Sequence, residues 1–227
     1  MNSKEKFSVI IRCKNEESWI GHCIQSVIDN LEEPEINVIN NGSTDQSIEI
    51  INSFRKNKNI KNNKSANYTE INIFDLNKYT PGKSLNYAVS KSKNNNILII
   101  SAHCVLINFD LKSTLKNLEK YKAIFGKQIP VWNGKRISKR YIWSHFVNKK
   151  IENMFSNHED RYFFHNAASV FKKSTLKKIP FDEEVEGKED RFWAQKIVNL
   201  NLKYLYDPNI SVYHHYTPNG NTWKGLG

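Results

Sequence analysis

The sequence predicts an α/β fold with a mostly parallel central sheet flanked by helices. Strand-like and helix-like segments alternate from residue 7 to residue 100. Within this part, four consecutive aliphatic residues at 97–100 are typical of a strand that is buried on both faces. An apolar segment also ends in a short polar turn around Gly42, before a helix begins. Such turns lie at the carboxyl end of parallel strands, where open α/β folds bind nucleotides.

The first half of the chain supplies the parallel strands. β-branched and aliphatic residues gather in four short runs, which we expect to be strands at 7–12, 36–39, 71–74 and 97–100. In the segments between them, apolar residues recur every three or four positions, which is the helical period. We therefore expect one helix capped by Asn15, a second helix at 43–54 and a third at 82–93.

The second half is less regular. Residues 126–149 are basic and aromatic and include Pro130 and Gly134, so we expect a long loop and a helix there. Further elements are predicted as a helix at 189–200 and strands at 203–206 and 210–213. The helix has four apolar residues at core spacing, namely Phe192, Trp193, Ile197 and Leu200. No repeat or linker interrupts the chain, so we expect a single domain over 1–227.

The composition favours an ordinary globular protein in a reducing compartment. Hydrophobic residues make up 39% of the chain, and no run approaches the roughly 20 apolar residues that a transmembrane helix needs. The cysteines at 13, 23 and 104 have no metal-like spacing, and no signal-peptide pattern precedes the first strand. The formal charge of +11 comes from lysines spread along the chain, without a nucleic-acid-binding motif. We expect a cytoplasmic protein that does not bind nucleic acid.

Seven short motifs follow one another along nearly the whole chain. They are Ser-Val-Ile-Ile-Arg-Cys-Lys-Asn-Glu at 8–16, Asn-Gly-Ser-Thr-Asp at 41–45, Gly-Lys-Ser-Leu-Asn at 82–86, Ser-Ala-His-Cys at 101–104, Pro-Phe-Asp-Glu at 180–183, Gly-Lys-Glu-Asp at 187–190 and Val-Tyr-His-His at 212–215. Together they resemble family 2 of the glycosyltransferases, which are inverting enzymes with the GT-A fold. The chain further resembles a bacterial, rhamnosyltransferase-like subgroup with Ser-Ala-His-Cys in place of the family's Asp-x-Asp. The resemblance implies a nucleotide-binding half at about 1–105 and an acceptor-binding, catalytic half at about 106–227.

By this resemblance, the residue before the 41–45 motif reads the nucleotide base. The family has a carboxylate there, which accepts the N3–H of uracil or thymine, whereas this chain has Asn40. An amide can accept that proton or donate to N3 of cytosine, and it can also simply shape the turn. We therefore expect a UDP-, dTDP- or cytidine-linked sugar as the donor. The other residues assigned to the donor are Arg12, Asn15, Glu16, Gly42, Ser43, Lys83, Asn86, Ser101 and Ala102.

Histidines stand where the family holds a divalent cation against the diphosphate. His103 occupies the position of the residue that coordinates the metal, and His214 and His215 follow the last predicted strand. Imidazole suits Mn²⁺ better than Mg²⁺, which prefers oxygen ligands. We expect one of these two cations as cofactor; the alternative is that the histidines contact the phosphates without a metal. Adjacent strand residues point in opposite directions, so only one of the last two histidines should serve, and His214 is favoured.

Asp190 is the predicted catalytic base. Glu189 and Asp190 begin a predicted helix after Gly187, and the family's base occupies this position. Asp190 would take the proton of the acceptor hydroxyl, with Glu189 in support. Two acids at a helix N-terminus also stabilise the helix, which is the structural alternative. Acceptor contacts are expected from His165, Asn166 and Trp193, with core packing as the alternative for each.

The expected function is transfer of a sugar to a hydroxyl of a bacterial surface glycan, such as a capsule or O-antigen, free or carried on a lipid. The basic, aromatic stretch at 135–150 could rest against an anionic membrane or cover the acceptor. One rival is a nucleotidyltransferase, but the loop at 13–17 lacks the glycines that this chemistry needs. The other rival is a non-catalytic sugar- or nucleotide-binding module. The loss of Asp-x-Asp favours it, and the retained Glu189-Asp190 opposes it.

Overall fold

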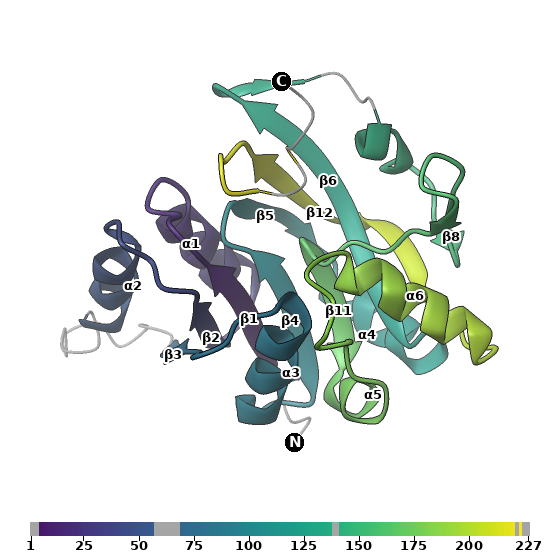
Figure 1. Cartoon of the computed structure of the whole chain (residues 1–227), viewed down its shortest axis with the longest axis horizontal. Helices are drawn as coiled ribbons and strands as arrows, with labels where there is room; N and C mark the ends of the chain where they lie inside the picture. The colour runs from purple at the N-terminus through teal and green to yellow at the C-terminus, as the bar shows by residue number, and fades with distance from the viewer. Residues whose placement is uncertain (1–4, 57–68, 138–140, 221–222, 224–227) are drawn as a thin grey trace.

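The structure is a computed structural model that describes residues 5–56, 69–137, 141–220 and 223. Its main feature is one large sheet in which the strands follow the order β3-β2-β1-β4-β11-β6-β12-β5 (Figure 1). The first four strands of this order are parallel, namely β3 (Glu70–Asp75), β2 (Glu35–Asn40), β1 (Phe7–Cys13) and β4 (Asn96–Ser101). Helices join them in the predicted β-α order.

The other half of the sheet is mixed. Its strands are β11 (Ala168–Lys172), β6 (Ala123–Trp132), β12 (Leu205–His215) and β5 (Cys104–Phe109). β6 and β12 are parallel, whereas β11 is antiparallel to both of its neighbours and β5 is antiparallel to β12. Four short strands complete the described set: β7 (Lys135–Arg136) beside β6, β8 (Ile151–Glu152) beside β12, and the separate pair β9 (Phe155–Ser156) and β10 (Arg161–Tyr162).

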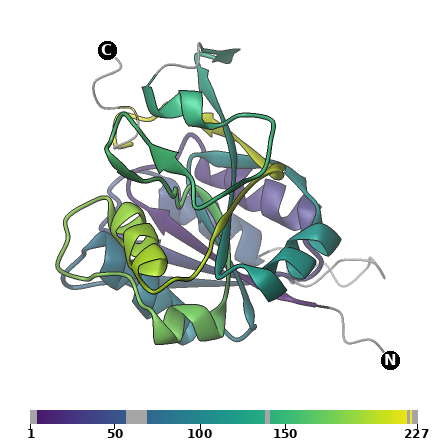
Figure 2. The ribbon, with the colours of Figure 1, turned by 90° about the vertical axis from the view of Figure 1, so that its right-hand side faces the viewer.

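Helices cover both faces of the sheet. They are α1 (Ile20–Asn30), α2 (Ser47–Lys56), α3 (Pro81–Lys91), α4 (Leu111–Lys120), α5 (Lys173–Lys178) and α6 (Glu189–Asn199), with a 3₁₀ helix η2 (Tyr141–His145). Successive residues of a strand point to opposite faces, so Val9 and Ile11 pack with α1, α2 and α4, while Ile10 packs with α3, α5 and α6. Figure 2 shows α5 and α6 on the opposite side of the sheet from α1 and α4.

The prediction of a loop and a helix at 126–149 is wrong. Residues up to Trp132 belong to β6, the short strand β7 follows, and the 3₁₀ helix η2 is the only helix in the described part of this segment. Gly126 serves close packing here, because a Cβ atom at this position would lie 2.7 Å from the carbonyl oxygen of Ile210 on β12. Pairing with β12 and β11 thus overrides the local preference of glycine and proline for turns.

Three smaller predictions also differ from the structure. The strands expected at 203–206 and 210–213 are parts of the single strand β12, whose pairing with β6 shifts register between Asp207 and Ser211. Phe192 and Leu200 of α6 are 47% and 51% exposed, so they are not core residues. Helix α1 begins at Ile20 without a side-chain cap, so Asn15 does not cap it. Within the described ranges, the helices are too short or too polar to cross a membrane.

Candidate functional site

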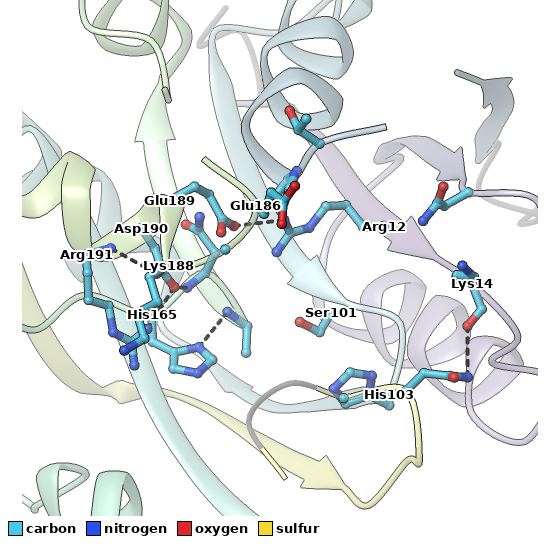
Figure 3. Close-up of a pocket in the computed structure, with 18 of the residues that line it drawn as sticks. Arg12, Lys14, Ser101, His103, His165, Glu186, Lys188, Glu189, Asp190 and Arg191 are labelled. Carbon is cyan, nitrogen blue, oxygen red and sulfur yellow. Dashed lines mark hydrogen bonds and ion pairs between the residues drawn. The ribbon is translucent and has the colours of Figure 1, made fainter. Parts of the chain in front are cut away.

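An open cavity of about 720 Å³ lies at the carboxyl edge of the parallel strands (Figure 3). The ends of β1 and β4 contribute Arg12 and Ser101, and the N-terminus of α6 contributes Glu189 and Asp190. The carboxyl ends of parallel strands meet at one edge, which is why residues distant in sequence share this cavity. Its other lining residues are Lys14, Glu16, Asn41, Tyr79, Thr80, Pro81, His103, Ile142, Glu159, His165, Asn166, Ala167, Glu186, Gly187, Lys188, Arg191, Asn219 and Gly220.

Asp190 is held by three hydrogen bonds. Its Oδ2 accepts from the backbone N–H of Asn166 at 3.1 Å and from Nη1 of Arg191 at 2.9 Å. Its Oδ1 accepts from the backbone N–H of Arg191 at 2.9 Å. The preceding Lys188 has φ of 58°, a left-handed turn that starts α6 at Glu189. The carboxylate is therefore fixed at the cavity wall, with only 6% of the residue exposed.

Glu189 joins the two halves of the chain. Its Oε1 lies 2.8 Å from Nη1 of Arg12, at the end of β1. Burial acts to lower the pKa of the Arg12 guanidinium, but the negative charges of Glu189 and Asp190 outweigh it and raise the pKa above its usual value. Arg12 thus stays charged and ties the donor edge of the sheet to α6.

Two histidines meet across the sheet. Nε2 of His103 lies 3.0 Å from Nε2 of His214, and the outer Nδ1 atoms lie 3.1 Å from Glu16 and 2.7 Å from Gln128. Burial and the neighbouring histidines hold the pKa of His214 well below its usual value, so its ring is neutral. Among the described residues, Oε2 of Glu16 is buried without a hydrogen-bond partner.

His103, His214 and Cys104 form a group that could hold a metal ion. Burial raises the pKa of the Cys104 thiol well above its usual value, which disfavours the thiolate that a metal needs. The two imidazoles, whose Nε2 atoms face each other, suit a divalent cation that accepts nitrogen ligands, while Glu16 contacts the opposite edge of the His103 ring. His215 lies apart from this group, because its ring stacks on Trp19 with centroids 3.8 Å apart.

The amide of Asn40 has a protein partner at each end. Its Nδ2 donates to Oδ1 of Asp75 at 2.7 Å, and its Oδ1 accepts from the backbone N–H of Ser43 at 3.0 Å. Gly42 adopts φ of 65° in this turn, which favours glycine. The hydroxyl of Ser43 accepts from the N–H of Asn15 at 3.1 Å. These hydrogen bonds therefore hold the loop after β1 and the loop after β2 against each other.

Ten residues assigned from the sequence do not line the cavity: Lys83, Asn86, Ala102 and Trp193, and also Asn15, Asn40, Gly42, Ser43, His214 and His215. Lys83 lies in the first turn of α3, where its N–H donates to the hydroxyl of the N-cap residue Thr80. Asn86 binds the segment at 181–183 with both ends of its amide. Ala102 is 1% exposed, and Trp193 is 2% exposed with its Nε1 donating to the carbonyl of Ile179. In this structure, core packing therefore removes Trp193 from contact with an acceptor.

His165 and Asn166 do line the cavity, next to Asp190. Burial and the positive charge of Arg191 hold the pKa of His165 well below its usual value, so its ring is neutral. Oδ1 of Asn166 accepts from the hydroxyl of Ser169 at 3.0 Å, and its buried Nδ2 has no partner among the described residues. This amide is thus available to a ligand hydroxyl.

Sequence reasoning missed several residues of the site. Arg191 directly follows Asp190, so an arginine beside the acidic pair was the available signal. Glu159, which binds Arg191, and Gln128, which binds His214, come from segments with no recognisable pattern. Lys14 lines the cavity where Lys83 was expected to supply the positive charge.

The family model described as glycosyl transferase family 2 matches residues 8–179, which is most of the chain. This chain belongs to glycosyl transferase family 2. No curated protein matches the sequence. The fold is that of the GT-A glycosyltransferases, which the similar solved structures share.

Three solved structures illustrate the similarity of fold. TarS of S. aureus, in complex with UDP-GlcNAc, is 21% identical with a TM-score of 0.70 over 97% of this chain and 61% of that chain. A mannosyltransferase of Pyrobaculum calidifontis, with GDP-Man and Mn²⁺, is 15% identical with a TM-score of 0.67 over 96% and 59%. GalNAc-T7, with UDP, GalNAc and Mn²⁺, is 14% identical with a TM-score of 0.70 over 97% and 45%. This chain therefore spans less than two thirds of each of these proteins.

Proposed function

We propose that this chain transfers a sugar from a nucleoside-diphosphate donor to an acceptor hydroxyl, with inversion at the anomeric carbon. One observation carries the proposal: a single cavity is lined by the fixed carboxylate of Asp190 and by His103, which approach it from different elements (Figure 3). A direct displacement requires a base that deprotonates the acceptor hydroxyl and a group that stabilises the leaving diphosphate.

Each step of this displacement has a residue in the cavity. Asp190 takes the proton of the acceptor hydroxyl, and the oxygen forms a bond to the anomeric carbon as the bond to the nucleotide breaks. The electron pair leaves with the diphosphate, whose charge is balanced by the positive side chain of Lys14, while the His103–His214 pair borders the same cavity. The unpartnered amide of Asn166 binds a sugar hydroxyl beside Asp190.

A divalent cation fits the histidine pair. His103 and His214 would hold it through their Nε2 atoms, with Glu16 orienting the His103 ring from Nδ1, and it would neutralise the diphosphate charge. Nitrogen ligands favour Mn²⁺ over Mg²⁺. In the alternative without a metal, His103 donates a hydrogen bond to the phosphate directly. The two solved neighbours that contain Mn²⁺ support the first alternative.

The base of the nucleotide is proposed to be uracil or thymine. Both polar ends of the Asn40 amide are occupied, and one of them holds the exposed carboxylate of Asp75 at the end of β3. A carboxylate accepts the N3–H of uracil or thymine, whereas N3 of cytosine is itself an acceptor. This arrangement favours a UDP- or dTDP-linked sugar over a cytidine-linked one.

The acceptor is proposed to be a bacterial surface glycan, free or lipid-linked. Contact with an anionic membrane would use the tip of the β6–β7 hairpin and the start of η2, where Trp132 and Tyr141 are 53% and 64% exposed beside the basic β7. Trp143 and Phe146, which the sequence suggested for this contact, are fully buried. Lys139 and Arg140 lie outside the described residues.

Calorimetric titration of the purified chain tests the donor site. UDP, dTDP, CDP, CMP and GDP are titrated with Mn²⁺ and with EDTA. We expect UDP or dTDP to bind, with affinity lost in EDTA if the histidines act through a metal. Binding of none of them would contradict the proposal and favour a sugar-binding module. Release of pyrophosphate from a nucleoside triphosphate and a sugar phosphate would instead indicate a nucleotidyltransferase.

A further inference from the structure

The buried guanidinium of Arg191 lies between two carboxylates, that of the proposed base Asp190 and that of Glu159. Nη1 of Arg191 donates to Oδ2 of Asp190 at 2.9 Å, while Nε and Nη2 each lie 3.3 Å from an oxygen of Glu159. Nη1 also donates to the carbonyl of Phe164 at 2.9 Å, and the Phe163 ring lies 4.4 Å from the guanidinium carbon. The guanidinium is thus held on several sides, with 8% of the side chain exposed.

This arrangement leaves Asp190 one free site for a proton. A carboxylate has about four lone-pair sites. Oδ2 accepts two hydrogen bonds, from Arg191 and from the N–H of Asn166, while Oδ1 accepts only the backbone N–H of Arg191. The remaining lone pair is therefore on Oδ1, and this atom can take the proton of an acceptor hydroxyl.

We propose that Glu159 is a positioning residue for Asp190. Glu159 binds the Nε–Nη2 edge of Arg191, so the guanidinium offers Asp190 one N–H instead of a two-pronged contact. A carboxylate that receives both prongs of an arginine is held more strongly as the anion and is a weaker base. Glu159 would thus keep Oδ1 of Asp190 open and able to accept a proton. This inference rests on the proposed function, because it assigns Asp190 the role of base.

The charges around Asp190 are consistent with this role. Two cations, Arg12 and Arg191, face three carboxylates, those of Glu189, Glu159 and Asp190. The set carries one net negative charge before proton transfer and none once Asp190 holds the proton. The other groups near Asp190 are His165, whose lowered pKa keeps it neutral, and the cavity-lining Lys188 and Glu186. On the far side of Glu159, burial lowers the pKa of His145, which is also neutral.

Carbon-13 NMR of aspartate-labelled protein tests the inference without a substrate. The Asp190 carboxyl signal is assigned by its loss in Asp190→Asn, and its chemical shift is followed with pH. In Glu159→Gln we expect the midpoint of this titration to fall by about one pH unit, since a neighbouring negative charge has been removed. Glu159→Asp retains the charge, so its midpoint should lie close to that of the wild type. Equal midpoints in the wild type and Glu159→Gln would overturn the proposal.

Glu186→Gln is the matched control. Glu186 also lines the cavity but is exposed, so its loss should leave the midpoint almost unchanged. A similar fall in Glu186→Gln would mean that the loss of any nearby negative charge lowers the midpoint, which contradicts a specific role of Glu159.

UDP titrated into Glu159→Gln separates the two proposals. A shifted midpoint in a protein that binds no nucleotide would contradict the proposed function and leave the Glu159 arrangement standing.

Discussion

The two sides of the cavity are built from different chemistry. On the donor side, neutral groups bind one another across short loops, as Asn40 binds Ser43 and Ser43 binds Asn15. On the acceptor side, buried charges pair across distant segments, as Arg12 pairs with Glu189 and Arg191 pairs with Asp190 and Glu159. A neutral hydrogen bond contributes about 1 kcal/mol, while breaking a buried ion pair costs about 3–5 kcal/mol. The donor loops therefore tolerate substitution better than the acceptor wall.

The largest expected effect is on turnover. Replacing Asp190 by Asn removes the base while keeping a side chain of the same shape, so the rate should fall by about 10²–10⁴-fold. UDP affinity should stay within about twofold, because the donor loops do not involve Asp190. Both are measured on one preparation, by release of UDP and by calorimetry. Glu184→Gln serves as the control, because Glu184 is exposed and does not line the cavity, and retained turnover in Asp190→Asn would rule out its role as the base.

The next effect is on stability, at the ion pair that joins the two sides. Arg12→Gln leaves the Glu189 carboxylate buried without its cation, and Glu189 is 6% exposed in its side chain. We expect the free energy of unfolding in urea to fall by about 3 kcal/mol. The double variant with Glu189→Gln should recover part of this loss, since no charge is then left unpaired. Additive losses would mean that the two charges do not interact.

His103→Ala tests where the diphosphate is bound. Loss of one contact to the phosphates should weaken UDP binding about tenfold, which corresponds to roughly 1.4 kcal/mol. Binding of uridine, which has no phosphate, should stay unchanged. His158→Ala is a suitable control because His158 is exposed and does not itself line the cavity. Equal loss of uridine affinity would point to a disturbed fold instead.

A smaller effect is expected on the donor side. Ser43→Ala removes the hydroxyl that accepts from the N–H of Asn15 at 3.1 Å. The free energy of unfolding should fall by about 1 kcal/mol, because the N–H can be solvated at this partly exposed position. Ser53→Ala, on the exposed surface of α2, provides the baseline. A loss as large as that of Arg12→Gln would remove the contrast between the two sides.

The smallest effect concerns an exposed charge cluster. Hydrogen bonds from Lys120, Lys203 and Tyr121 lower the pKa of Glu152 to about 2. Its contribution to stability is therefore present above pH 4.5 and is lost as the pH falls toward 2, because the unfolded chain binds the proton first. Glu152→Gln should flatten the fall of the melting temperature slightly in this range. Salt at 0.5 M should remove the difference, since exposed charges are screened.

The donor side could be read from the sequence because it depends on local order. Consecutive strands and helices place 12–16, 40–43 and 101–103 at one edge of a parallel sheet, whatever the rest of the chain does. The partner of Asn40 could not be predicted in this way. The bond of Asn40 to Asp75 depends on the pairing of β2 with β3, which no local pattern reveals.

On the acceptor side, only the residues that belong to a recognisable sequence motif could be predicted. Glu189 and Asp190 carry such a motif, whereas Glu159 lies in a short turn between β9 and β10 and meets Arg191 through tertiary packing alone. β6 was missed for a related reason, because Gly126 and Pro130 are tolerated there by contacts with β12 that form only in the folded chain.

The hydrogen bonds from Asn219 to the carbonyls of Lys14 and Asn15 span 205 and 204 positions of sequence. Contacts of this span form late, because the entropy of closing so long a loop must be offset by structure already in place. During synthesis, the first parallel strands can assemble while the residues that complete the cavity wall have not yet left the ribosome. The cavity is thus one of the last parts of the molecule to be completed, and a truncated chain would carry the ends of the parallel strands without the rest of the cavity wall.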